Sequence, residues 1–155
     1  MENSDLEFQF NGETGWGKGG CLNEENRVQE LLRMAKKLDV SCREQLRYII
    51  EQNIKYSQQL DLTPPYYRLA LLCLFKVMEV EDTVLFYKAK FEVDFDTGFL
   101  ACPEMVVGKD KQETLEFLKV NHHTKILDYL GGLDYSVLKT YQDFCVVADN
   151  AIKNL

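Results

Sequence analysis

The sequence predicts a mainly α-helical fold: a single helical domain of about five helices, with a small β-hairpin inserted after the central helix. Over most of the chain, apolar residues recur at intervals of three and four, the period of a helix that buries one face. Capping residues and prolines separate these apolar stripes. One stretch, residues 87–95, instead alternates strictly between apolar and polar residues, as a half-buried strand does.

Length and composition are those of one folded domain. The chain has 155 residues, of which 46% are hydrophobic and 28% charged, so it has enough apolar surface to offset the entropy of ordering. The beginning differs from the rest, because it holds five of the nine glycines and shows no helical period. We interpret residues 1–20 as a flexible, glycine-rich acidic arm and residues 21–155 as the helical domain.

Two amphipathic helices are expected to begin this domain. Asn23 is a candidate N-cap of the first, whose apolar stripe ends at Leu38. Ser41 is a candidate N-cap of the second, because Glu44 follows at capping-box spacing and apolar residues then recur as far as Ile54. The simplest product is an antiparallel helix pair.

A central helix and the hairpin are expected next. Two prolines break the chain before residues 66–78, which are apolar nearly all round, as in a helix packed on several sides. The alternation over 87–95 predicts a strand, the Asp-Thr-Gly sequence at 96–98 a turn, and residues 99–103 a return strand.

Helical spacing returns in the last third of the chain. It extends from Leu115 to Leu130, where two glycines give a stop signal. Asp134 or Ser136 could cap the final helix, whose regular apolar stripe includes Phe144. These segments complete the predicted helical domain.

Charge and cysteine usage limit the partners and the compartment. The net charge is −7 and the sequence shows no basic stripe, so nucleic acid is a poor candidate partner. A protein partner is expected instead, with a basic one the best match. Five cysteines without a C-x-x-C pair, and no signal segment, predict a cytoplasmic protein with free thiols. The longest apolar stretch is too short for a membrane span.

Acidic residues gather on the connection and hairpin that follow the central helix. Loops on a helical scaffold commonly carry binding residues, although a solvated acidic face would have the same composition. The candidate protein-binding residues are Glu79, Glu81, Asp82, Glu92, Asp94 and Asp96.

We interpret the chain as a non-enzymatic protein-binding module that docks on and regulates or neutralises a basic protein partner. In size, acidity and helicity it resembles the small acidic immunity proteins with which bacteria neutralise toxins. No sequence motif supports this resemblance. No catalytic residue, metal ligand or cofactor is predicted.

The alternative function is a nucleotide-responsive regulator or enzyme that uses the stretch GETGWGKGG. Gly12, Gly17 and Lys18 match the spacing of a phosphate-binding loop. Gly19, however, stands where that loop needs a Ser or Thr hydroxyl, and consecutive glycines disfavour a helix there. A flexible arm explains the same glycines.

Two smaller motifs have structural explanations. His122 and His123 diverge on a helix, so they cannot grip one metal ion together, and we expect them to cap or link two helices. The Asp-Thr-Gly triplet resembles the aspartic protease signature, but those enzymes need two such aspartates in a β fold. A turn accounts for the single triplet.

Overall fold

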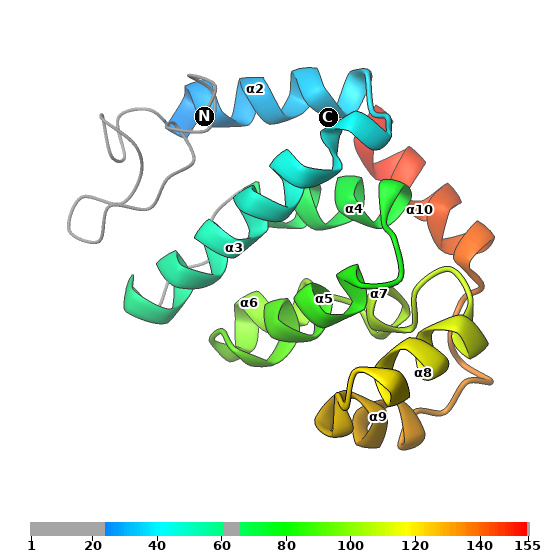
Figure 1. Ribbon diagram of the computed structural model, residues 1–155. Coiled ribbons are helices and arrows are strands. Elements are labelled where there is room, and N and C mark those ends of the chain that lie inside the picture. The colour runs from blue at the N-terminus through cyan, green and yellow to red at the C-terminus, as the bar shows by residue number, and fades with distance from the viewer. Residues whose placement is uncertain (1–23, 61–65, 155) are drawn as a thin grey trace.

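Figure 1 shows the computed structural model, which describes residues 24–60 and 66–154. All regular secondary structure in this part of the chain is helical, which confirms the expected mainly α-helical class. The elements are α2 Glu24–Lys36, the 3-10 helix η2 Val40–Cys42, α3 Arg43–Leu60, α4 Tyr67–Val77, α5 Asp82–Phe91, α6 Phe95–Phe99, α7 Pro103–Val107, α8 Lys111–Val120, α9 Thr124–Gly131 and α10 Tyr141–Lys153.

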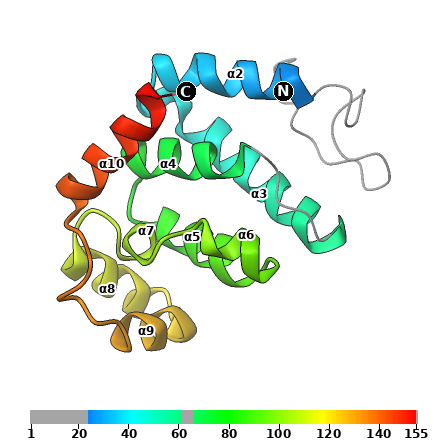
Figure 2. The ribbon, with the colours of Figure 1, turned by 180° about the vertical axis from the view of Figure 1, so that it is seen from behind.

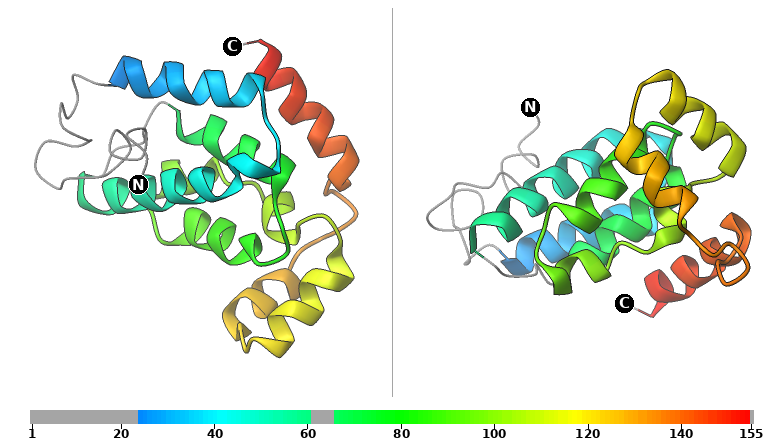
Figure 3. Two further views of the ribbon diagram at one scale, coloured as in Figure 1. Left: turned by 45° about the horizontal axis from the view of Figure 1, so that its top comes forward. Right: turned by 90° about the horizontal axis from the view of Figure 1, so that it is seen from below.

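The expected central helix is α4. Every residue of α4 except Arg68 and Lys76 is buried, since the helix packs against α3, α10 and α2. α5 packs on the other side of α3 and also contacts α6 and α7. In the left view of Figure 3, α2 lies at the top of the molecule, α10 at its right and the α8–α9 pair at its lower right. A helix without a polar face is stable here because its neighbours cover several sides.

The junction between α2 and α3 differs from the sequence-based expectation. Asp39, and not Ser41, caps the turn, because Asp39 Oδ1 accepts a hydrogen bond from the Ser41 backbone N–H at 2.7 Å. Ser41 lies inside η2, so the predicted Ser41 cap is wrong. The other predicted cap, Asn23, lies outside the described residues.

The predicted β-hairpin is wrong: residues 87–91 end α5, residues 92–94 link it to α6, and the predicted return strand 99–103 runs from the last residue of α6 to the first of α7. The helical period buries Leu85, Phe86 and Ala89 on one face of α5. A lone two-stranded hairpin is marginally stable, whereas a helix satisfies its backbone groups locally. Asp94 then accepts a hydrogen bond from the Thr97 N–H at 3.0 Å, so the Asp-Thr-Gly sequence forms a capped helical turn.

Gly98 permits α6 to fold back onto the end of α5. A Cβ atom at this position would lie 2.2 Å from the backbone oxygen of Lys90, far inside contact distance. The glycine is therefore required by the close approach of two backbones.

The stretch of helical spacing from Leu115 to Leu130 divides between α8 and α9. His122 adopts a φ of 58° and His123 is the N-cap residue of α9, so the histidines link two helices as expected. Asp134 accepts from the Ser136 N–H at 3.0 Å in a turn before α10, whereas Thr140 caps that helix. Asp134 and Ser136 were therefore wrong as caps. Figure 2 shows α10 returning alongside α4.

Candidate functional site

The six predicted acidic residues separate into two groups in the structure. One group lies at the start of α5 and the other at the junction between α5 and α6. The first consists of Glu79, Glu81 and Asp82, and the second of Glu92, Asp94 and Asp96.

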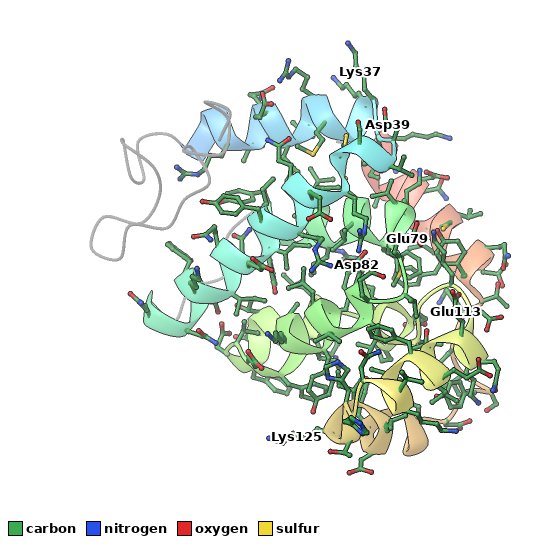
Figure 4. All side chains as sticks on the ribbon, viewed as in Figure 1. Lys37, Asp39, Glu79, Asp82, Glu113 and Lys125 are labelled. Carbon is green, nitrogen blue, oxygen red and sulfur yellow. The ribbon has the colours of Figure 1, made fainter. Side chains whose placement is uncertain are left out.

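Asp82 is completely buried and holds α5 against α3. Arg43 Nε donates to its Oδ2 at 2.7 Å, and Arg47 donates to its Oδ1. The backbone N–H of Glu79 donates to Oδ2 at 2.8 Å. Figure 4 shows Asp82 between the two helices. This carboxylate is surrounded by internal donors, so its place in the fold is structural.

Glu79 and Glu81 lie at the exposed edge of this buried cluster. Arg43 Nη2 donates to Glu81 Oε1 at 2.8 Å. The hydrogen bond with Asp82 raises the pKa of the Arg43 guanidinium, so the arginine stays charged. Because Arg43 and Arg47 lie beside the three acids, most of the negative charge of this group is neutralised within the protein.

Asp94 joins α6 to α3. Ser57 Oγ donates a hydrogen bond to Asp94 Oδ2 at 2.6 Å, and the Thr97 backbone N–H donates one to Asp94 Oδ1. Burial acts to raise the pKa of Asp94, but the hydrogen bonds from Ser57 and Thr97 outweigh it and lower the pKa to about 2. Asp94 therefore remains ionised while it positions α6.

Two phenylalanine side chains extend into water from α6. Phe95 is 84% exposed and Phe99 is 73% exposed, and their i, i+4 spacing places them on one face. Asp96 is also exposed and precedes Phe99 by three residues, so it neighbours Phe99 on the helix surface, whereas Phe95, one residue before it, projects in a different direction. Thr97 and Gly98 are buried on the opposite side. We call Phe95, Asp96 and Phe99 the α6 surface.

Aromatic and acidic residues also precede α6. Phe91, at the end of α5, is 49% exposed, and its ring packs against Tyr87 and Tyr129 with centroid separations of 4.7 and 4.9 Å. Glu92 is exposed directly after it. From Phe91 to Phe99 the sequence contains acids but neither Lys nor Arg.

Sequence reasoning missed Phe95 and Phe99, because strict alternation assigned the phenylalanines of this stretch to the buried face of a strand. A signal was nevertheless present. Phe91, Phe95 and Phe99 recur every four residues, which is a helical spacing.

The alternative nucleotide site cannot be placed, since Gly12, Gly17 and Lys18 lie outside the described residues. Within residues 24–60 and 66–154, no three His, Cys, Asp or Glu side chains gather as a metal site requires. In the same ranges, no helix combines the length and apolarity needed to cross a bilayer.

No protein-family model, curated protein or solved structure matches this chain. Its function is therefore inferred from its own residues: a helical protein that displays an acidic and aromatic surface on a short, capped helix.

Proposed function

We propose that the chain is a non-enzymatic protein-binding module whose α6 surface docks on a basic segment of another protein. The exposure of Phe95 and Phe99 on α6, with the exposed Asp96 three residues before Phe99, is the observation that carries this proposal. Aromatic side chains are enriched among the residues that contribute most to interface affinity. Two large rings on one turn of helix supply such anchors.

The charge around these rings selects the chemistry of the partner. Asp96 and Glu92 are exposed and Asp94 is held in its ionised form. Lys or Arg side chains would complement these carboxylates, and an Arg guanidinium could also stack on a phenylalanine ring. The expected partner therefore presents cations next to apolar side chains. An anionic lipid surface would be repelled by the same acids.

The α6 surface is rigidly supported. The hydrogen bond from Ser57 fixes Asp94 to α3, and the close approach of Gly98 to Lys90 fixes α6 to α5. A surface that is ordered before binding loses less entropy when a partner docks. Docking would regulate or neutralise the partner if the covered basic segment carries the partner's own activity.

Site-specific photo-crosslinking in cells of the source organism tests this proposal. A photoreactive phenylalanine analogue at position 95 or 99 should capture a protein that the same analogue at Val40 does not. Val40 is a matched control because it is 74% exposed. Val40 lies just before the first residue of α3. Ser57, which contacts Asp94, lies near the last residue of α3, about 20 Å away along the helix.

The captured protein is then purified and its binding measured with variants of the full chain. Phe95→Ala with Phe99→Ala should weaken binding by about 30-fold or more, the effect of losing a binding hot spot. Asp96→Lys should slow association and flatten its dependence on ionic strength. Val40→Ala should bind like the natural chain.

Three results would each contradict the proposal. The crosslink could form equally from position 40, the double alanine variant could bind with unchanged affinity, or the captured species could be a second copy of this chain. Sedimentation of the purified chain identifies the last case.

A further inference from the structure

A cavity of about 390 Å³ opens between α5 and the start of α9, apart from the α6 surface. Val84 and Tyr87 of α5 and Ile126 of α9 are among its lining residues. Ile126 is buried and the other two are half-buried, whereas the lysines that line the cavity are exposed. The apolar side chains therefore form the floor and the charged ones the rim.

The rim is mainly basic. Lys88 comes from α5, Lys125 from α9, and His122 and His123 from the link between α8 and α9. Glu92 is the acid among the lining residues. Lysines from two separate helices border one cavity, and their mutual repulsion would be offset by an anion held between them.

His123 is held in place at this rim. Its ring stacks on Phe117 with a centroid separation of 6.0 Å and an interplanar angle of 26°. A neutral imidazole carries one N–H donor, so the histidines can add hydrogen bonds to the charge of the lysines.

We propose that this cavity binds a small aryl phosphate, with its ring on the apolar floor and its phosphate at the basic rim. The volume lies near the lower end of the range for ligand pockets, which fits a body of one ring. Tyr87 offers an aromatic surface to that ring. A phosphate group carries nearly two negative charges and several acceptor oxygens, so it can engage both lysines at once.

Nuclear magnetic resonance titration of the full chain with phenyl phosphate tests the proposal. Saturable shifts are expected at His122, His123, Lys125 and Ile126. Inorganic phosphate lacks the ring and benzyl alcohol lacks the charge, so each should bind at least about tenfold more weakly, the effect of losing about 1.4 kcal/mol.

Substitutions of the rim lysines test whether these two side chains bind the phosphate, or whether any surface lysine would attract it. Lys88→Gln and Lys125→Gln should each weaken phenyl phosphate binding by about tenfold. Lys37→Gln is the matched control, since Lys37 is exposed and lies at the opposite end of the molecule from Lys125 in Figure 4. Circular dichroism confirms that each variant is folded.

The ligand's source is assigned by a further comparison. A phosphotyrosyl tripeptide that binds more tightly than phenyl phosphate identifies a protein source, whereas equal or weaker binding identifies a free small molecule. The proposal is overturned if phenyl phosphate gives no saturable shift up to about 10 mM. Equal binding of inorganic phosphate, or unchanged binding by both rim variants, also overturns it.

Discussion

Arg43 and Asp82 form a two-pronged ion pair across the interface between α3 and α5. Arg43 Nε donates to Asp82 Oδ2 at 2.7 Å and its Nη2 donates to Oδ1 at 3.0 Å. The two residues are 39 positions apart in the chain. Because Asp82 is fully buried, the pair specifies how the two helices meet.

The first prediction concerns this pair. Asp82→Asn should lower the free energy of unfolding by about 3 kcal/mol, because two partly buried arginines lose their counter-charge. The exposed neighbour provides the control, since Glu81→Gln should cost less than about 1 kcal/mol. Urea unfolding measures both. Similar losses for the two variants would mean that the buried pair does not specify the interface.

A second prediction compares two glycines. Gly98→Ala should destabilise the fold by about 1 to 3 kcal/mol, because its Cβ would meet the Lys90 backbone oxygen at 2.2 Å. Gly131→Ala should be neutral or slightly stabilising, since a Cβ there meets nothing within 4 Å and alanine favours a helix. Thermal unfolding of the two variants distinguishes these outcomes, and equal melting temperatures would contradict the proposed close approach.

A third prediction concerns acid stability. The pKa of Asp94 is lowered to about 2, whereas an aspartate in an unfolded chain titrates near about 4. The ionised group therefore stabilises the fold above about pH 4, and this contribution is lost as the pH falls toward about 2. Asp94→Asn retains a capping oxygen but loses the charge. The stability difference between the natural chain and this variant should shrink across that window, and a constant difference would refute the prediction.

A fourth prediction is that removing an aromatic ring lowers the stability of the fold in the core but not on the α6 surface. Phe144 is 6% exposed and meets Phe75 edge to face, with centroids 5.0 Å apart. Phe144→Ala should cost about 3 to 5 kcal/mol, whereas Phe95→Ala should leave stability within about 0.5 kcal/mol. A melting curve unchanged by Phe144→Ala would show that α10 contributes little to the core.

Thiol reactivity gives a fifth prediction. Burial raises the pKa of Cys73 to about 12, so its reactive thiolate is scarce and covered. Cys42 and Cys145 are half-buried and should react faster with a thiol reagent in the folded protein. Mass spectrometry after timed labelling gives the order, and equal rates before unfolding would contradict it.

Most of the helices were predictable because a buried stripe repeats at helical spacing within one element. Apolar periodicity predicted α2, α3, α4 and α10, whereas Pro103 was expected to end a return strand and instead begins α7. The hairpin was predicted wrongly because residues 87–95 span the end of one helix and the start of another. A two-residue alternation across that junction imitates a strand.

The candidate site was only partly predictable, for a different reason. Sequence proximity grouped Asp82 with its acidic neighbours, but its partners Arg43 and Arg47 come from another helix and no local pattern reveals them. Likewise, alternation assigned Phe95 to the buried face of a strand, and Phe99 was expected to begin the return strand. Their exposure follows from the packing of the Gly98 side of α6 against the end of α5, which is a tertiary effect.

The placement of Asp96 next to Phe99, on the helix that exposes two rings, also governs how the protein behaves as a solute. Bare aromatic patches draw copies of a protein together as concentration rises. A carboxylate within the patch acts as a gatekeeper, since bringing two copies face to face would crowd like charges. Solubility and partner choice therefore depend on the same few atoms of α6.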